Sequence, residues 1–333
     1  KLPASGFLVD GETARLSKEG NFVGRHIYVP LEGVAVQINA YNFPCWGMLE
    51  KLAPSFLAGM PSIVKPASPS AWLTFRIVEI LTASSIVPDG ALQLISGSVG
   101  DLFNHLTCQD VVAFTGSAST AQKIRSHPTI VREAVRLNIE ADSLNCIILG
   151  PDVAPGSETF YYFAKEVVRE MTVKAGQKCT AIRRVIVAEG QAEVVVDALK
   201  ERLAKIQVGD PKTEGVRMGP LADEEALRAA REGVAKLTGE AAIVYGDPNR
   251  KEFEPRQGVF MEPVLLLCQK PLEATAIHEV EIFGPAATVM TYSDVDEAVA
   301  LARKGGGSLV GSIFSEDEDF IAKTMFGLAP YHG

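Results

Sequence analysis

The sequence has no excess of positive charge, and this absence argues against a nucleic-acid partner. Its 333 residues contain 32 lysines and arginines against 41 aspartates and glutamates, which gives a net charge of −9 at pH 7. A protein that binds a phosphate backbone needs a basic face that displaces counterions. Since this composition supplies no such face, we expect no nucleic acid among the partners.

Long apolar stretches are also missing. No run approaches the roughly 18 consecutive apolar residues of a membrane-spanning helix, so we expect no membrane partner. The first residues, KLPAS, show neither an initiator methionine nor the basic and apolar regions of a signal peptide. We therefore expect the chain to be an excerpt of a longer one.

Cysteines are few and follow no metal-binding pattern. The five of them form an odd set with no CxxC pair and no histidine at metal-ligand spacing. This usage is typical of reduced, intracellular thiols that mostly pack as small apolar side chains. The sequence thus predicts a cytoplasmic location and no metal site. The cysteines are Cys45, Cys108, Cys146, Cys179 and Cys268.

What the sequence does contain is the composition and alternation of an α/β protein. Hydrophobic residues make up 47% and charged residues 22%, typical of a globular protein, and the length allows about two domains. Short β-rich runs alternate with helical stretches, which predicts parallel βαβ units and a doubly wound sheet that binds ligands at the carboxyl ends of its strands. We expect a domain boundary near 143, dividing the chain into 1–142 and 143–333. The expected strands are 34–40, 62–65, 92–96, 110–116, 143–150 and 183–188, and the expected helices are 46–60, 71–81, 119–125, 160–174 and 192–206.

The sharpest chemical signal is the segment Gly-Gln-Lys-Cys-Thr around Cys179. A thiol becomes a nucleophile when a positive neighbour, a helix N-terminus or backbone donors favour its thiolate. Cys179 follows a Gly-Gln turn, stands beside Lys178 and precedes Arg183 and Arg184. The alternative is an inert buried cysteine, which is the usual state of a lone cysteine.

Two further side chains suit carbonyl chemistry. Glu140 ends an alternating apolar stretch, where burial would let a carboxylate act as general base toward water. An exposed carboxylate is the alternative there, and Asp142 is a weaker candidate for the same role. Asn42 follows the expected strand 34–40, and its amide can donate to an oxyanion. An Asn before Phe-Pro is equally a common turn residue.

Three turns have features of a dinucleotide site, although each is weak alone. Phe114, Gly116 and Ser117 join a strand to a helix, where backbone N–H groups can hold a pyrophosphate. No intact GxGxxG motif accompanies them. Lys65 ends a short strand and suits a ribose or phosphate, and the Glu281–Phe283 pair can offer a carboxylate and an aromatic face.

Taken together and in order, these segments resemble the aldehyde dehydrogenase superfamily over nearly the whole chain. The segments NAYNFPCWG, IEADSLN, AGQKCTAIRR and EIFGP are similar to the corresponding segments of one branch of this superfamily. That branch includes the aldehyde dehydrogenase domain of the ring-opening protein of phenylacetate degradation and the dehydroadipyl-CoA semialdehyde dehydrogenase of benzoyl-CoA oxidation. The resemblance implies an aldehyde-dehydrogenase-like α/β fold, with a Rossmann-type cofactor domain and a second, catalytic α/β domain.

The resemblance also implies a reaction. Cys179 would attack the aldehyde carbon as thiolate, and the Asn42 amide and the Cys179 backbone N–H would hold the oxyanion. Oxidation would leave a thioester on Cys179, and Glu140 would activate the water that hydrolyses it. The usual Glu-Leu-Gly-Gly pattern departs here to Glu-Ala-Asp-Ser at 140–143.

For the cofactor, the resemblance implies one set of contacts and one preference. Ser68 stands where relatives that prefer NAD often carry a glutamate, and without that carboxylate a 2′-phosphate is not repelled. We therefore expect NADP to be preferred, with NAD possible. The implied contacts are the backbone of Ile38 and Asn39 near the nicotinamide, Lys65 and Ser68 at the adenine ribose, Phe114, Gly116 and Ser117 at the pyrophosphate, and Glu281 and Phe283 at the nicotinamide ribose.

The expected substrate is a small-molecule aldehyde, specifically a CoA-linked semialdehyde from aromatic-compound degradation, and the expected assembly is a homo-oligomer, at least a homodimer. Two alternatives stay open. An acylating or acyl-reducing relative would use the same cysteine without the general base, and a non-catalytic scaffold would keep only the fold. Glu140 argues against the first, and the joint presence of Cys179, Glu140 and Asn42 argues against the second.

Overall fold

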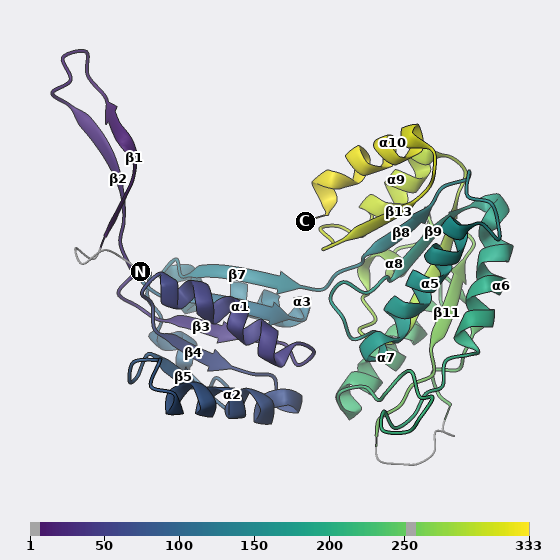
Figure 1. Cartoon of the computed structure of the whole chain (residues 1–333), viewed down its shortest axis with the longest axis horizontal. Helices are drawn as coiled ribbons and strands as arrows, with labels where there is room; N and C mark the ends of the chain where they lie inside the picture. Colours follow the sequence, from purple (N-terminus) through teal and green to yellow (C-terminus); the bar gives the residue numbers. More distant parts are fainter. Residues whose placement is uncertain (1–6, 251–257, 333) are drawn as a thin grey trace. The chain divides into compact units, whose positions relative to one another are not determined.

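The computed structural model describes residues 7–250 and 258–332. The chain divides into two compact units, Lys1–Ala141 and Asp142–Gly333 (Figure 1). Each unit has its own parallel or mainly parallel sheet, and each is described by itself below. Within the described ranges, no helix has the length and apolar character that a membrane span requires.

The first unit is built on a five-stranded parallel sheet. The strand order is β5-β4-β3-β6-β7. The chain adds β4 and β5 on one side of β3 and then β6 and β7 on the other side, so the order in which strands are added reverses between β3 and β6. In sheets of this kind, ligands bind beyond the carboxyl ends of the strands at such a reversal. The strands are β3 (Ala35–Ile38), β4 (Ser62–Lys65), β5 (Leu92–Leu94), β6 (Val111–Gly116) and β7 (Arg136–Ala141). The helices are α1 (Pro44–Leu57), α2 (Ala71–Ala83), α3 (Ala118–Arg125) and α4 (Pro128–Arg132), with short 3-10 turns η1 (Ser68–Ser70) and η2 (Leu102–His105).

A separate antiparallel hairpin precedes this sheet. It joins β1 (Leu8–Arg15) to β2 (Val23–Tyr28), and Leu8 lies opposite Tyr28. Nearly all of its residues are exposed, including Val9, Phe22 and Ile27. The alternation of β and α elements gave no indication of this hairpin.

The second unit is a six-stranded mixed sheet covered by helices. Its order is β10-β11-β12-β9-β8-β13, with β10 antiparallel and the other pairs parallel. The strands are β8 (Cys146–Leu149), β9 (Arg184–Ala188), β10 (Ala242–Tyr245), β11 (Val264–Cys268), β12 (Ala286–Tyr292) and β13 (Gly311–Phe314). The helices are α5 (Glu158–Thr172), α6 (Ala192–Leu203), α7 (Glu224–Leu237), α8 (Ala276–Glu279), α9 (Val295–Arg303) and α10 (Glu318–Leu328), with 3-10 turns η3 (Val173–Gly176), η4 (Glu189–Gln191) and η5 (Ala329–Tyr331).

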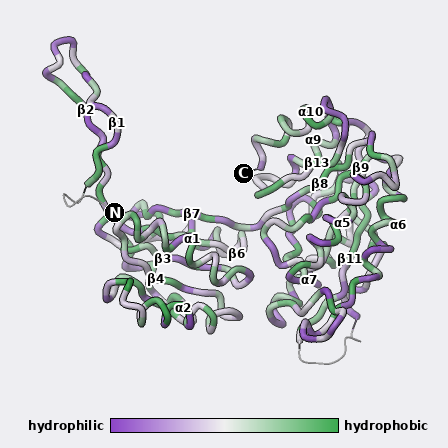
Figure 2. The backbone as a smooth tube through the Cα atoms, in the orientation of Figure 1, coloured by the Kyte–Doolittle hydropathy of each residue, from purple (hydrophilic) through white to green (hydrophobic). Residues whose placement is uncertain are grey.

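Alternate side chains of the central strands enter different cores. In β8, Ile148 belongs to a core shared with α7 and α9, whereas Ile147 belongs to a core shared with α5 and α6. All four residues of β8 are buried, and the strand is among the hydrophobic stretches of the backbone in Figure 2. A strand buried on both faces reads as a continuous apolar run, which is why CIIL predicts a strand here.

The predicted α/β fold is confirmed. The boundaries of single elements differ from the prediction because local geometry decides them. The helix expected at 46–60 begins at Pro44, since proline has a φ suited to the first helical turn. The helix expected to reach residue 174 ends at Thr172, and Lys174 takes a left-handed conformation.

Candidate active site

The carboxyl ends of four strands lie at one edge of the first unit's sheet. Ile38 at the end of β3 pairs with Lys65 of β4 and with Phe114 of β6. Thr115 of β6 in turn pairs with Glu140 of β7. The register therefore brings these residues to the edge where the strand order reverses, as a ligand site in a doubly wound sheet requires.

The turn after β6 is shaped by its glycine. A Cβ on Gly116 would lie 2.6 Å from the Phe114 ring, so a larger residue would displace that ring. Ser117 then caps α3, and its hydroxyl accepts from the N–H of Thr120 at 3.3 Å. The first N–H groups of this helix provide the kind of site that holds a phosphate.

A buried amide at the same edge lacks a partner. Asn39 follows β3 and is 3% exposed, and among the described residues neither its side-chain oxygen nor its nitrogen has a hydrogen-bond partner. The hydroxyl of Thr115 is likewise buried with no hydrogen-bond partner within residues 7–250 and 258–332. Buried polar atoms of this kind are costly unless something satisfies them. These orphaned groups at the strand ends therefore fit a polar ligand such as a dinucleotide.

The other expected residues of the first unit lie as follows. Lys65 is half-buried, and this burial lowers the pKa of its ammonium group. Ser68 is exposed and opens η1. Asn42 is half-buried in the turn before α1, and Glu140 is half-buried near the end of β7. Cys179 belongs to the second unit, so the convergence of these two side chains with the thiol stays a prediction.

Cys179 lies on a loop whose backbone is unusual. Three consecutive residues before it take positive φ angles: Lys174 at 54°, Ala175 at 51° and Gly176 at 70°. A Cβ on Gly176 would lie 2.1 Å from the carbonyl oxygen of Gly284. Only glycine permits this approach, so the loop is held directly against the segment that follows Glu281. Non-glycine residues with such angles cluster at functional sites.

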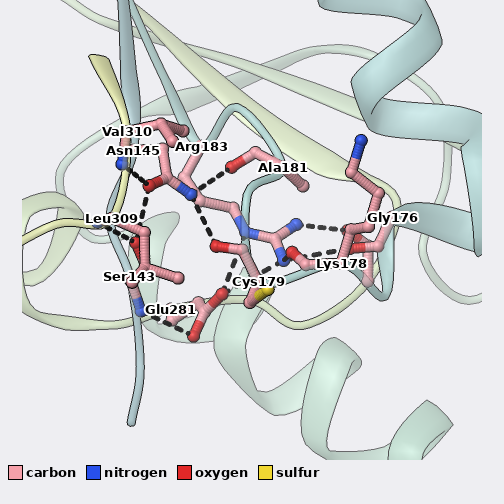
Figure 3. A network of polar contacts seen from close by, with 11 residues as sticks. Ser143, Asn145, Gly176, Lys178, Cys179, Ala181, Arg183, Glu281, Leu309 and Val310 are labelled. Atoms are coloured by element: carbon pink, nitrogen blue, oxygen red, sulfur yellow. Dashed lines mark hydrogen bonds and ion pairs between the residues drawn. The ribbon is translucent and has the colours of Figure 1, made fainter. Parts of the chain in front are cut away.

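Asn145 and Arg183 bind the backbone of this loop (Figure 3). The Asn145 amide donates to the carbonyl oxygens of Cys179 and Ala181 at 2.8 and 2.9 Å. The Arg183 guanidinium donates to the carbonyl oxygens of Gly176 at 2.9 Å and Lys178 at 3.3 Å. Both side chains are buried. The loop is therefore fixed by side chains of its own unit.

Glu281 is paired inside the second unit. Its Oε1 lies 3.1 Å from Arg183 Nη2, and its Oε2 accepts from the N–H of Ser143 at 3.0 Å. Burial raises the pKa of the Glu281 carboxyl, and the Arg183 charge opposes that rise. The Phe283 ring centroid lies 5.6 Å from Arg183 Cζ. The ribose contact expected of Glu281 and Phe283 stays a prediction.

The cationic neighbours of Cys179 are arranged differently from the expectation. The ammonium group of Lys178 bonds to Glu170, and Arg184 is fully buried, donating to the carbonyl oxygens of Leu144, Leu301 and Ala302. The Lys174 charge also interacts with the Cys179 thiolate. Sequence adjacency to Cys179 indicated Lys178, Arg183 and Arg184, and the structure adds Lys174 to these cations.

The remaining cysteines show no metal site. Cys146 and Cys268 are buried as expected, whereas Cys45 is half-buried and Cys108 is exposed. Across residues 7–250 and 258–332, no group of histidine, cysteine, aspartate and glutamate side chains is placed to hold a metal ion.

Comparison with known proteins decides the family. Residues 6–327 match the model of the aldehyde dehydrogenase family. The chain belongs to the aldehyde dehydrogenase family. It is 48% identical to the 3,4-dehydroadipyl-CoA semialdehyde dehydrogenase of Aromatoleum evansii, over all of this chain and 65% of that protein. It is 30% identical to a putative aldehyde dehydrogenase of Staphylococcus haemolyticus, over 87% of this chain and 60% of that protein.

Solved structures of aldehyde dehydrogenases share the fold. An NAD-dependent aldehyde dehydrogenase from Sinorhizobium meliloti superposes with a TM-score of 0.81 at 24% identity, over 96% of this chain and 61% of that one. The betaine aldehyde dehydrogenase from Staphylococcus aureus in complex with NAD⁺ gives 0.77 at 27% identity, over 91% and 58%. The chain thus spans about three fifths to two thirds of the length of these relatives. The predicted resemblance to this family is confirmed.

Sequence reasoning missed four residues in or around the Cys179 loop of this aldehyde dehydrogenase: Ser143, Asn145, Glu170 and Lys174. One of them left a readable signal, because Asn145 is a polar residue directly before the apolar run of β8. A buried amide at such a position must bond to something. The other three look like ordinary polar residues of turns or helix faces in the sequence.

Proposed function

We propose that the protein containing this chain oxidises an aldehyde to the carboxylic acid with a nicotinamide dinucleotide. The observation that carries the proposal is Cys179, a half-buried thiol on a loop that side chains of its own unit fix. Membership of the aldehyde dehydrogenase family supports the same reaction. In this proposal residues 1–142 bind the cofactor and 143–333 carry the nucleophile.

Each side chain has a role in the proposed reaction. The Cys179 thiolate adds to the aldehyde carbon, and the Asn42 amide and Cys179 N–H hold the oxyanion that forms. When bound, the nicotinamide supplies the hydride acceptor for oxidation of this adduct to a thioester. Glu140 then takes a proton from water, the water oxygen attacks the thioester carbon, and the carboxylic acid leaves as the thiol is restored.

For the cofactor, we propose that the edge formed by β3, β4 and β6 holds the dinucleotide. The N-terminus of α3, with Gly116 and Ser117, would receive the pyrophosphate, and Lys65 the adenine ribose. The orphaned amide of Asn39 supports a polar ligand there. NADP is preferred in this proposal, because Ser68 brings no negative charge toward a 2′-phosphate and Lys65 brings a positive one.

For the substrate, we propose a CoA-linked semialdehyde from the degradation of aromatic compounds. The support for the CoA-linked semialdehyde is the 48% identity to a 3,4-dehydroadipyl-CoA semialdehyde dehydrogenase, and the link to aromatic compounds rests on the resemblance described under the sequence analysis. A cytoplasmic location accords with the proposal, since its nucleophile must stay a reduced thiol.

A homo-oligomer belongs to the same proposal. A two-stranded hairpin is marginal in water by itself, yet the hairpin of β1 and β2 exposes Val9 and Ile27 on its strands and Phe22 in the turn between them. A second copy of the chain would cover these side chains.

The experiment is a cofactor-reduction assay on the full-length protein with free aliphatic, aromatic and CoA-thioester semialdehydes. We expect NADPH and the free acid as products, with the highest kcat/KM for the CoA-linked substrate. Absence of reduction with every aldehyde would reject the function. If the enzyme transfers the acyl group to added coenzyme A and releases an acyl-CoA, the protein is the acylating relative instead. A higher kcat/KM for simple free aldehydes than for the CoA-linked semialdehyde would reject the proposed substrate class.

A further inference from the structure

Cys179 lies between two peptide groups, and a different buried side chain holds each of them. The carbonyl oxygen of the 178–179 peptide accepts from Arg183 Nη2 at 3.3 Å. The carbonyl oxygen of the 179–180 peptide accepts from Asn145 Nδ2 at 2.8 Å. Figure 3 shows both contacts. Because the backbone has only two soft dihedrals at each residue, fixing the planes on both sides fixes the Cys179 Cα and its side-chain origin.

The Arg183 contact also sets the direction of an N–H group. In a trans peptide the C=O and N–H bonds point in opposite directions. With the Lys178 carbonyl directed at Arg183, and also at the N–H of Ala181 at 3.1 Å, the Cys179 N–H is directed away from them. An oxyanion donor is effective only when it is aimed before the charge develops.

The Asn145 amide has a complete set of partners. Its nitrogen donates to the carbonyl oxygens of Cys179 and Ala181, and its oxygen accepts from Ser143 Oγ at 2.6 Å and from the N–H of Val310 at 3.0 Å. The side chain is fully buried. The reversed amide would place its oxygen against two carbonyl oxygens, so this orientation is the one the surroundings require.

Arg183 connects the same loop to Glu281. Its Nη1 donates to the carbonyl oxygen of Gly284 at 3.0 Å, its Nη2 to that of Gly176 at 2.9 Å, and Nη2 lies 3.1 Å from Glu281 Oε1. A planar guanidinium can serve several acceptors at once in fixed directions, which a lysine ammonium cannot reproduce.

We propose that Asn145 and Arg183 are positioning residues that aim the Cys179 thiol and N–H at a substrate carbonyl. The inference rests on the proposed role of Cys179 as nucleophile. Neither side chain needs to touch the substrate, because each acts through a peptide group of the nucleophile loop.

The test compares two reactions of Cys179 that need no cofactor and no aldehyde. Acylation by p-nitrophenyl acetate proceeds by attack of the thiolate on the ester carbon, through an oxyanion, with loss of p-nitrophenolate. Alkylation by iodoacetamide displaces iodide and forms no oxyanion. Mass spectrometry of the Cys179 peptide gives both rates. A positioning role predicts that a variant loses acylation rate and keeps its alkylation rate.

The variant is Asn145→Leu, and its matched control is Gln191→Met. Gln191 is also buried, and its amide also donates to two carbonyl oxygens, those of Gly150 and Val153. Those residues follow β8, whereas Asn145 precedes it, so the control lies at the opposite edge of the sheet. Each change replaces the amide by an apolar side chain of similar shape and removes its donor from two backbone carbonyls. Asn145→Leu also removes the acceptor of Ser143 Oγ and of the Val310 N–H.

We expect Asn145→Leu to slow acylation by about 10- to 100-fold while alkylation stays within about 3-fold of wild type. Gln191→Met should leave both rates unchanged. Arg183→Lys, which keeps a positive charge beside Glu281, should also slow acylation selectively, and it decides the matter if Asn145→Leu does not fold.

Three results would overturn the proposal: wild-type rates in the variants, equal loss of acylation in Gln191→Met, or parallel changes in both reactions that indicate an opened loop. Because these reactions use the protein without cofactor, they stand apart from the proposed function. That function fails only if the wild-type protein reduces no cofactor with any aldehyde.

Discussion

Lys178 and Glu170 form an ion pair, with the Lys178 Nζ 2.6 Å from Glu170 Oε1 and side-chain exposures of 17% and 8%. The positive charge next to Cys179 in the sequence is therefore compensated by a carboxylate of α5. Partial burial lowers the pKa of the Lys174 ammonium group, the Cys179 thiolate opposes this, and the Lys178 charge adds to the lowering. The interaction is reciprocal, so Lys174 favours the thiolate.

Replacing Lys174 should therefore change the pH at which Cys179 reacts. Lys174→Met removes a cation that stabilises the thiolate, so the midpoint of the pH–alkylation curve should rise by about half a pH unit. The measurement is the iodoacetamide rate at Cys179 from pH 5 to 10. Lys178→Met is the comparison and should move this midpoint less, because Glu170 already compensates that charge. A larger shift for Lys178→Met would show that sequence adjacency was the better guide.

Replacing Glu140 should separate the two halves of the proposed reaction. Glu140→Gln keeps the size of the side chain and removes the base, so thioester formation continues while hydrolysis stops. Rapid mixing with NADP and aldehyde should give a burst of NADPH close to one per active site. Steady-state turnover should fall by about 100-fold or more.

Asp142→Asn is the matched control for that experiment, because Asp142 is the neighbouring carboxylate that competes for the role of base. It should keep both the burst and the turnover. Unchanged steady-state turnover in Glu140→Gln, or loss of turnover in Asp142→Asn alone, would assign the base elsewhere.

His278 makes the second unit sensitive to acid. Burial is the main cause that lowers its pKa to about 4; the charges of Arg184 and Lys304 act in the same direction, and the Pro271 carbonyl and Glu240 oppose them. Nε2 lies 2.9 Å from the Pro271 carbonyl oxygen and Nδ1 lies 3.3 Å from Arg184 Nη1. The ring is therefore neutral, with its proton on Nε2, and a second proton would face the guanidinium.

The sign of the effect follows from proton binding. Between pH 6.5 and about 4, the unfolded chain binds a proton at this histidine and the folded chain does not. The free energy of unfolding must then fall as the pH falls through that window. We expect the His278→Gln variant to lose less unfolding free energy between pH 7 and pH 5 than the wild-type protein does. The measurement is a urea titration followed by hydrogen exchange of peptides from the second unit. The exposed His105→Gln should keep the wild-type pH dependence, and equal slopes in all three proteins would exclude His278 as the cause.

The fold could be predicted from the sequence where the local residue pattern and the burial in the folded chain agree. The run at 146–149 is apolar on both faces and forms a fully buried strand, and Gly116 and Ser117 mark a strand-to-helix turn that the structure shows. The hairpin of β1 and β2 was missed because its exposed strands carry no regular alternation of buried and exposed positions.

The surroundings of Cys179 could not be predicted for a different reason. Arg183 and Glu281 stand 98 positions apart, and Asn145 and Cys179 stand 34 apart, so their contacts exist only once the sheet has formed. Local sequence shows which residue types can donate or accept, but the pairing depends on which strand ends become neighbours.

Cofactor preference is a test of charge at the end of β4. Ser68 is exposed and lies three positions beyond Lys65, the last residue of that strand. Ser68→Glu would place a carboxylate where an adenosine 2′-phosphate is expected, and two like charges repel more strongly near a protein surface than in bulk water. The ratio of kcat/KM for NADP to that for NAD should therefore fall by about 10-fold or more, equivalent to about 1.4 kcal/mol.

Ser68→Gln has nearly the same size as the glutamate variant without its charge, so it should keep the wild-type ratio. Direct titration of each cofactor by protein fluorescence gives a second measure that does not depend on turnover. A wild-type protein that prefers NAD would contradict the NADP proposal outright. If Gln lowers the ratio as much as Glu does, steric exclusion at Ser68 and not repulsion of the phosphate controls the choice of cofactor.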